Sequence, residues 1–271
     1  MPADRLDNPT RWQALQPLLA PLDPQALVEH VSDIDSTNTE LMRRARAGDT
    51  RSCLLLADTQ SAGRGRLGRQ WHSRPGDALT MSLGLRLAPQ SWSGLSLAVG
   101  CSLAGALDPH FDKGIGLKWP NDLMLAPWGR PRKLGGILIE TVWRQGDAAL
   151  ERFVVIGIGL NLAAPPAADY RTEPVGLRSV LAADISAQDV LHVVLPALVA
   201  GLQKFSVHGF ASFAAEFARR DVFAGRELQL STGVHGMADG VDQDGVLWLN
   251  TPAGRVSVSS DEVSVRATGV A

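Results

Sequence analysis

The sequence predicts an α+β fold, in which a mixed, largely antiparallel sheet with helices is followed by a small C-terminal β-barrel of the SH3-like kind. Between residues 53 and 160 most apolar runs are short and of strand type, whereas a parallel α/β chain would alternate strands with helices. After Phe223 the chain changes to short alternating runs separated by turn signals such as Asp244-Gly245. We therefore divide the chain into an N-terminal extension at 1–30, a main domain at 31–222 and a small domain at 223–271.

Local signals place the elements of the main domain. Thr37 to Glu40 has the spacing of a capping box and Gly48 supplies a stop, which predicts a helix over 37–47. The other apolar runs predict strands at 53–57, 79–87, 116–119, 135–141 and 152–160, a buried helix of small residues within 87–107, a hairpin-like turn at 145–147 and a helix over 190–217 despite Pro196.

The small domain has its own strand signals. Strands are expected at 227–230, 234–240, 246–249 and 255–258. About fifty residues suit an SH3-like module, although the pattern also fits a simple meander.

Composition limits the class of protein. With 271 residues, 45% of them hydrophobic, the chain is long enough for a full core, and its formal charge of −2 argues against a general nucleic-acid binder. Cys53 and Cys101 lie in apolar runs without metal-ligand spacing and are expected to be reduced core residues. The proline-broken N-terminus lacks the features of a signal peptide, so a cytoplasmic protein is expected, with no membrane association.

The segment at 63–73 is the strongest local signal. It places glycines at 63, 65 and 68, arginines at 64, 66 and 69, and a tryptophan at 71 in one short loop. Glycine lets backbone approach a ligand closely, and arginine presents a fork of donors that suits phosphate and carboxylate oxygens. Trp71 adds a flat face for a base. A disordered RNA-binding segment and an ordinary surface loop are the alternatives, but strands on both flanks favour an anion-binding loop within a folded domain.

Three further motifs carry polar residues at strand ends. Residues 118–122 read Lys-Trp-Pro-Asn-Asp, which is also a common composition for a structural turn. Residues 133–140 place two glycines beside Lys133, which otherwise reads as a solvated lysine before a strand. Residues 157–161 end a strand with two glycines and Asn161, where backbone can approach a ligand.

Together with Ser36-Thr37-Asn38 and Gln60, these motifs resemble those of the biotin–protein ligases in order and approximate spacing, over residues 31–266. Residues 261–266 are similar to the final barrel strand of that family. The resemblance implies a class II synthetase-like catalytic domain that activates biotin with ATP as biotinyl-5′-AMP. Biotin is then transferred to one lysine of a carboxylase's biotin carboxyl carrier domain. ATP, biotin and Mg²⁺ are the implied small molecules, with the metal ligands left open.

The resemblance also implies roles for individual residues. It implies biotin contacts for Ser36, Thr37, Asn38, Gln60, Gly63, Arg64, Arg66, Lys133 and Gly135. It implies nucleotide contacts for Arg66, Arg69, Trp71, Lys118, Asn121, Asn161 and Arg266. It implies catalytic roles for Lys133, Arg64, Asp122 and Lys118. Lys133 would supply positive charge where carboxylate and phosphate meet, and Asp122 would be a base for the carrier lysine or a guide that holds it. Helix capping by Ser36 or Thr37, and a structural turn at Asp122, are the alternatives.

Departures from the family pattern narrow these expectations. Only about thirty residues precede the 37–47 helix, where regulatory members carry a winged-helix DNA-binding domain, so no repressor function and no DNA partner are expected. The Pro-rich insert at 124–132 leaves the positions of Trp128 and Arg132 open. Phe217 stands where the family often has a tryptophan, which is expected to affect packing only.

Other functions remain as alternatives. A lipoate ligase or an octanoyltransferase would use a related fold, but the transferase needs a cysteine nucleophile in a ligand loop. A nucleic-acid-binding module would explain the arginines alone. A weak homodimer through an exposed sheet edge is implied by the resemblance only.

Overall fold

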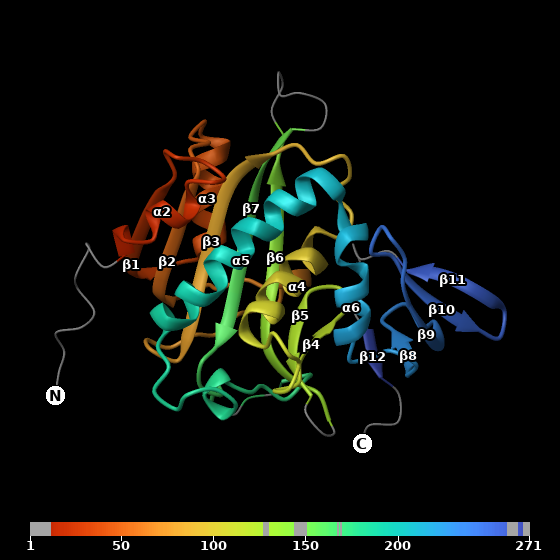
Figure 1. Ribbon diagram of the computed structural model, residues 1–271. Helices are drawn as coiled ribbons and strands as arrows, with labels where there is room; N and C mark the ends of the chain where they lie inside the picture. The colour runs from red at the N-terminus through yellow and green to blue at the C-terminus, as the bar shows by residue number, and fades with distance from the viewer. Residues whose placement is uncertain are drawn as a thin grey trace.

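A computed structural model of the chain describes residues 12–126, 130–143, 151–166, 168, 170–258 and 265–267. Its main body is a seven-stranded sheet with the order β1-β2-β3-β7-β6-β5-β4 (Figure 1). The strands are β1 (Leu27–Ile34), β2 (Cys53–Gln60), β3 (Ala78–Leu87), β4 (Ile115–Lys118), β5 (Asp122–Leu125), β6 (Arg132–Val142) and β7 (Arg152–Asn161). Only the β1–β2 pair is parallel among these described strands, so the predicted mixed, largely antiparallel sheet is confirmed.

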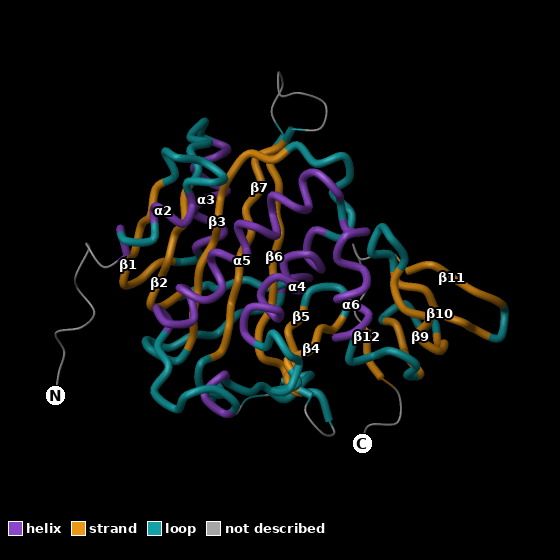
Figure 2. Tube along the Cα trace, viewed as in Figure 1, coloured by secondary structure: helices purple, strands orange, loops and turns teal. Residues whose placement is uncertain are grey.

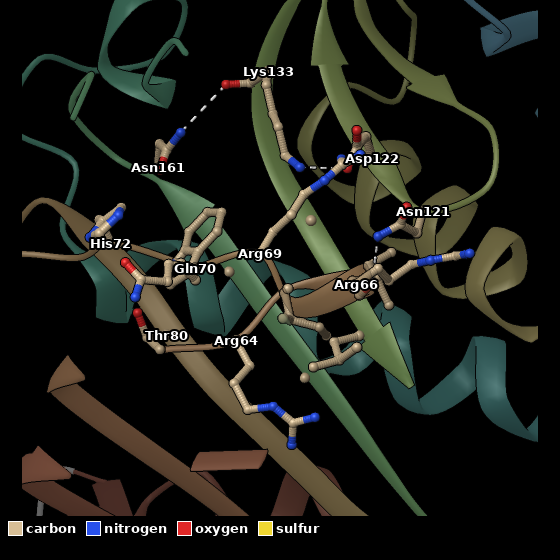
Figure 3. Close-up of a pocket in the computed structure, with 18 of the residues that line it drawn as sticks. Arg64, Arg66, Arg69, Gln70, His72, Thr80, Asn121, Asp122, Lys133 and Asn161 are labelled. Atoms are coloured by element: carbon tan, nitrogen blue, oxygen red, sulfur yellow. Dashed lines mark hydrogen bonds and ion pairs between the residues drawn. The ribbon is translucent and has the colours of Figure 1, made fainter. Parts of the chain in front are cut away.

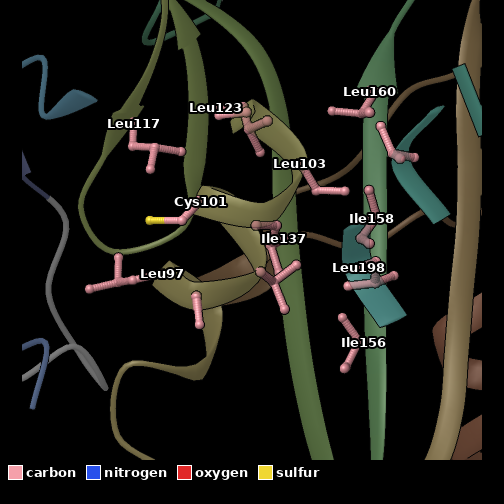
Figure 4. Close-up of a cluster of buried hydrophobic side chains, with 14 of the residues drawn as sticks. Leu97, Cys101, Leu103, Leu117, Leu123, Ile137, Ile156, Ile158, Leu160 and Leu198 are labelled. Atoms are coloured by element: carbon pink, nitrogen blue, oxygen red, sulfur yellow. The ribbon is translucent and has the colours of Figure 1, made fainter. Parts of the chain in front are cut away.

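Helices pack on both faces of this sheet. The helices are α2 (Gln16–Leu19), α3 (Thr37–Arg46), α4 (Leu95–Leu107), α5 (Ala187–His208) and α6 (Ala214–Arg220). Because side chains alternate along a strand, Leu54 of β2 belongs to the large core with α4 and α5, whereas its neighbour Leu55 belongs to the smaller core under α3. Figure 4 shows the large core, where Leu103 of α4 and Leu198 of α5 lie beside β7.

The uncharged stretch within 87–107 forms the end of β3 and the core helix α4, as predicted. Helix α5 is the one described helix with the length and composition of a membrane span, and half of its most apolar window is buried within the molecule. Its contacts with α2, α4 and β3 are those of a core helix.

The small domain is a five-stranded antiparallel sheet with the order β11-β10-β9-β8-β12, at one side of the main body (Figure 2). Its strands are β8 (Glu227–Leu230), β9 (His235–Val241), β10 (Leu247–Thr251), β11 (Gly254–Val258) and β12 (Val265–Ala267). The first four agree with the predicted strands. Since β12 returns to pair with β8 rather than with β11, the domain is not a simple meander. Most of the predicted final strand, at 259–264, lies outside the described residues.

A close contact attaches the small domain to the main domain. Trp119 donates its indole N–H to the carbonyl of Gly245 at 3.0 Å, and Ser93 donates to the carbonyl of Asp244 at 2.6 Å. Gly245 has a φ of +75°, and a Cβ there would lie 2.9 Å from the Cα of Gly94. The turn that the sequence identified at 243–245 is therefore the docking point, and it holds the small domain beside the Lys118 to Asp122 turn.

The structure differs from the predicted elements at β1, at β5 and in the helix predicted over 190–217. Strands β1 and β5 were not predicted, because β1 carries charged residues on a half-buried edge and β5 has only four residues. The long helix predicted over 190–217 is divided, since Gly209 adopts a φ of +62° and ends α5. The turn predicted at 145–147 and Trp128 lie outside the described residues. Leu15 and Leu19 are buried in the large core, so described residues ahead of position 31 pack on the main domain. The division at 30 and 222 stays a prediction.

Candidate active site

A cavity of about 460 Å³ lies between the sheet, the start of α3 and the arginine-rich loop (Figure 3). Thirteen of the predicted site residues line it, namely Ser36, Thr37, Asn38, Gln60, Arg64, Arg66, Arg69, Trp71, Lys118, Asn121, Asp122, Lys133 and Asn161. These residues come from motifs far apart in the sequence. The fold therefore brings the sequence motifs together around one cavity, while the role of each residue stays a prediction.

One side of the cavity is a chain of uncharged polar groups, which we call the polar wall: Thr37, Asn38, Gln60 and Ser82. Gln60 Oε1 accepts the Thr37 backbone N–H at 2.7 Å and also lies 3.1 Å from Thr37 Oγ1. Thr37 Oγ1 lies 2.7 Å from Ser82 Oγ, which donates to Asn38 Oδ1 at 2.7 Å. Thr37, Asn38 and Ser82 are each at most 3% exposed. The wall is thus fixed by buried hydrogen bonds before any ligand binds.

Ser36 both caps α3 and lines the cavity. Its side chain accepts the backbone N–H of Thr39, which satisfies one of the free donors at the helix start. The capping alternative for Ser36 is therefore correct, and it leaves the residue facing the cavity.

Two glycines of β7 make room for side chains of the site. A Cβ on Gly157 would clash with the amide of Asn38, and a Cβ on Gly159 would lie 2.5 Å from the indole of Trp71. The sequence analysis attributed these glycines to a close approach of ligand. In the structure it is Asn38 and Trp71 that lie against them, and both glycines still border the cavity.

The opposite end of the cavity is charged. Lys133 donates to Asp122 Oδ1 at 2.6 Å, and Lys118 Nζ lies 3.9 Å from Asp122 Oδ2. Burial opposes ionisation of Asp122, but the charges of Lys133 and Lys118 outweigh it and lower the pKa of its carboxyl below the ordinary value. Arg69 adds to this effect, and Figure 3 shows its side chain reaching toward Asp122. Asp122 is therefore an ionised partner of the lysines, which is more than a turn residue would need.

The backbone of the arginine-rich loop makes hydrogen bonds within the loop itself. Trp71 N–H donates to the Gly63 carbonyl at 2.9 Å, and Gly65 N–H donates to the Arg69 carbonyl at 2.7 Å. Leu67, at the tip, has a φ of +55° and is 53% exposed. Arg64 extends from this loop to Glu140 of β6, at 3.2 Å. The loop is a folded flap at the cavity, as expected from the strands that flank it.

Among the described residues that line the cavity, two have a buried side-chain polar atom without a hydrogen-bond partner. These atoms are the indole Nε1 of Trp71 and the hydroxyl of Thr80. A buried polar group without a partner is unfavourable, so these atoms are suited to a ligand or to water.

Two predicted residues, Gly63 and Gly135, are not among those that line the cavity. A Cβ on Gly63 would clash with the Trp71 carbonyl, and a Cβ on Gly135 would lie 2.5 Å from the Gly159 carbonyl, so close backbone packing explains both glycines. Arg266 is in β12, and its side chain lies outside what the structure describes. Their predicted ligand contacts stay predictions.

Several cavity residues were missed by the sequence analysis, among them Thr80, Ser82, Tyr170 and Arg171. Thr80 and Ser82 carried a usable signal, because they are polar residues at alternate positions of an otherwise apolar strand and so share one face. Tyr170 and Arg171 lie in an irregular segment without such a pattern.

Neither cysteine belongs to this site. Cys53 and Cys101 are buried in the two cores, and burial raises the pKa of each thiol to about 12. A thiol that stays protonated at neutral pH is a poor nucleophile, so the expectation of inert core cysteines agrees with the structure.

Comparison with known proteins identifies the family. Residues 32–161 match the Biotin/lipoate A/B protein ligase family. The Bifunctional ligase/repressor BirA of Escherichia coli (strain K12) is 33% identical over an alignment of 244 residues that covers 86% of this chain and 72% of that protein. The chain belongs to this ligase family. A Biotin–[acetyl-CoA-carboxylase] ligase of Paracoccus denitrificans is 31% identical over 239 residues, covering 84% of this chain and 96% of that one.

The structural comparison extends the agreement to the fold of the ligase family. The biotin protein ligase from Aquifex aeolicus in complex with biotin and ATP superposes with a TM-score of 0.72 at 26% identity, over 89% of this chain and 99% of that one. The resemblance drawn from the sequence motifs is confirmed.

Proposed function

We propose that this protein is an ATP-dependent biotin–[acetyl-CoA-carboxylase] ligase, which forms biotinyl-5′-AMP and transfers biotin to a lysine of a biotin carboxyl carrier domain. The observation that carries the proposal is that one cavity joins an uncharged polar wall to a cluster of basic side chains. Biotin has the same two ends, a neutral ureido bicycle and a carboxylate. The names of the relatives in Paracoccus denitrificans and Aquifex aeolicus support this choice of substrate.

In the first step the biotin carboxylate attacks the α-phosphorus of ATP, and pyrophosphate leaves. Both reacting groups are anionic, so fixed positive charge near them lowers the barrier. We assign this role to Lys133 together with Arg64, Arg66 and Arg69 at the cavity. The described residues contain no group of three or more His, Cys, Asp or Glu that could hold a metal ion, so we assign Mg²⁺ to the phosphates of the nucleotide.

In the second step the carrier lysine, once its ammonium has given a proton to solvent, attacks the biotinyl carbonyl of the mixed anhydride. The amide bond forms, the bond to the phosphate breaks, and AMP leaves. A carboxyl with a lowered pKa is a weak base, because it gives up its proton readily. We therefore propose that Asp122 guides the incoming ammonium by charge. Trp71, Asn121 and Asn161 also line the cavity and are assigned to the nucleotide, and Asn161 Nδ2 donates to the Lys133 carbonyl at 3.4 Å.

We further propose that the enzyme acts in the cytoplasm on the carrier domain of a carboxylase, without DNA as a partner. The weak homodimer remains a prediction from the resemblance to the family.

The deciding experiment is ATP–pyrophosphate exchange with biotin or lipoate as the acid, followed by transfer of label to a purified carrier domain. Exchange that depends on biotin, and transfer to one lysine, are expected. Exchange with lipoate alone would replace the proposal with a lipoate ligase, and acyl transfer without ATP would indicate an octanoyltransferase. Salt-dependent retention of nucleic acid on a filter, with no exchange, would favour the nucleic-acid-binding alternative.

A further inference from the structure

Glu140 of β6 stands behind the polar wall and has not been given a role so far. Its carboxylate accepts from Asn38 Nδ2 at 3.0 Å, and Arg64 Nη1 lies 3.2 Å from its other oxygen. The side chain is 20% exposed. An ionised carboxylate can only accept hydrogen bonds, so it determines which way its neighbours must point.

The acceptor-only character of Glu140 affects every hydrogen bond along the polar wall. Asn38 Nδ2 faces two groups that only accept, Glu140 Oε2 at 3.0 Å and the Leu138 carbonyl at a longer 3.4 Å, so the amide oxygen is turned toward Ser82. Ser82 must then donate its single hydroxyl proton to Asn38 Oδ1. The 2.7 Å contact between the two hydroxyls can therefore contain a proton only if Thr37 donates to Ser82.

The chain of donors leaves one proton missing at its far end. Thr37 has given its proton to Ser82, so none remains for the 3.1 Å contact between Thr37 Oγ1 and Gln60 Oε1. Gln60 Oε1 must stay where it is, since it accepts the Thr37 backbone N–H. Both oxygens belong to residues that line the cavity, and they present lone pairs. A ligand that covers these two oxygens leaves them unpaired unless it brings a hydrogen-bond donor.

We propose that Glu140 is a positioning residue that sets the direction of the hydrogen bonds along the polar wall and so selects acids whose head group carries an N–H donor. The inference rests on the proposed function and names the part of the substrate that this side of the site reads. The ureido ring of biotin offers N–H groups, whereas the dithiolane ring of lipoate has none. A site built to pair with a donor rejects a molecule that lacks one, because its buried acceptors would be left unpaired.

A neutral residue at position 140 would no longer fix the direction of the hydrogen bonds along the polar wall. In Glu140→Gln the side-chain amide can donate to Asn38, which can then turn its own nitrogen toward Ser82. Ser82 would donate to Thr37, and Thr37 to Gln60. Every contact of the wall would then contain a proton without a ligand, and the turned amide would give up only the long 3.4 Å hydrogen bond from Asn38 Nδ2 to the Leu138 carbonyl. The folded protein should therefore lose little stability while its need for an N–H donor disappears.

The test measures dissociation constants by calorimetry on the full chain for biotin and for biotin methylated on its ureido nitrogens. Wild type should prefer biotin, and Glu140→Gln should lower that preference roughly tenfold, or about 1.4 kcal/mol. The size of the methyl group affects both proteins equally and cancels in the comparison. The KM for ATP should not change.

Two further variants separate the effect of hydrogen-bond direction along the wall from the effect of the Glu140 charge. Ser82→Ala interrupts the wall but keeps Glu140, so it should lower the preference as Glu140→Gln does. Arg64→Ala removes the other neighbour of Glu140 and leaves the wall intact, so it should weaken binding of both ligands and keep the preference.

An unchanged preference in both Glu140→Gln and Ser82→Ala would overturn the inference, and so would a loss of preference in Arg64→Ala alone. If Glu140→Gln does not fold, Ser82→Ala and Arg64→Ala still decide. A wild-type protein that neither binds biotin nor supports biotin-dependent exchange would instead reject the proposed function.

Discussion

The two sides of the cavity are built in different ways. On the sheet side, the polar wall and the Lys133–Asp122 pair lie on α3 and on strands, and buried hydrogen bonds fix them. On the loop side, the backbone hydrogen bonds of residues 63–71 join this segment to itself, and the Arg64 side chain is 49% exposed. The sheet side is therefore organised before a ligand arrives, whereas we expect the loop side to gain much of its order from the ligand.

The largest effect is expected on the sheet side, at Lys133. Lys133→Ala should reduce biotin-dependent pyrophosphate exchange by about 10²- to 10³-fold, since a fixed charge is lost where two anions meet. The structure also predicts a lower melting temperature, because Asp122 is 9% exposed and would lose its closest cation.

A double variant separates the two consequences of losing Lys133. Lys133→Ala with Asp122→Asn should recover much of the melting temperature without recovering exchange. Near-normal exchange in either protein would remove Lys133 from the mechanism and with it the argument for a preorganised sheet side.

A matched pair of glycines compares the two sides directly. Gly157→Ala pushes on Asn38 in the rigid wall, and Gly159→Ala pushes on Trp71 at the loop. We expect Gly157→Ala to raise the dissociation constant for biotin about tenfold, because a buried amide cannot move without breaking hydrogen bonds. Gly159→Ala should leave biotin binding nearly unchanged and raise the KM for ATP a few-fold. Equal effects of both variants on biotin would mean that the wall is no more rigid than the loop.

The same contrast explains what could be predicted from the sequence. The loop could be recognised from the sequence, because glycine, arginine and tryptophan in one short segment have few purely structural explanations. The polar wall could not be recognised in this way. Ser82 is a single hydroxyl in a largely apolar strand, and Glu140 acts through Asn38, which is about a hundred positions away in the sequence. The role of such residues depends on which residues lie next to them in the fold, and neighbours across a sheet depend on strand order and register.

The fold could be predicted to a similar extent. Long apolar runs such as 79–87 and 152–160 gave their strands, and so did the capped helix that begins at Thr37. Strand β1 was missed because an edge strand with Glu29 and Asp33 lacks clean alternation. Its pairing with β2 is parallel and non-local, which no turn signal in the sequence indicates.

A third prediction concerns order in the loop. The loop carries Leu67 with a positive φ and three arginines that repel one another, so a bound anion should stabilise its closed form. Trypsin cleavage after Arg64, Arg66 or Arg69 should slow several-fold with biotin and ATP, whereas cleavage after Arg51, outside the site, should not. Equal slowing at all of these positions would indicate global stabilisation, and no slowing would show that the loop is as rigid as the sheet side without ligand.

The smallest effect is expected at Asp221, a largely buried carboxylate without lysines beside it, and it measures how much burial of such a group lowers the stability of the fold. Burial raises the pKa of Asp221 to about 6 from 3.8, opposed by the Phe223 backbone N–H, whereas the lysines lower the pKa of Asp122. A raised pKa in the folded state means that ionisation weakens folding, so the destabilisation by Asp221 grows between about pH 4 and pH 6 and is constant above. Asp221→Asn should therefore stabilise the protein by about 1 kcal/mol at pH 8, a value reduced for the partial exposure of the side chain, and change little at pH 4.

Asp122→Asn should have the opposite sign. A lowered pKa means that the ionised carboxylate stabilises the fold above the unfolded value, and that this contribution is lost as the pH falls through the folded pKa. Asp122→Asn should thus destabilise the protein at pH 8, with the difference from wild type shrinking below about pH 4. Urea unfolding of the three proteins from pH 3.5 to pH 8 measures both effects. If the two variants shift stability in the same direction at pH 8, the lysines do not compensate the burial of Asp122, and the sheet side of the cavity is not an organised charge pair before ATP binds.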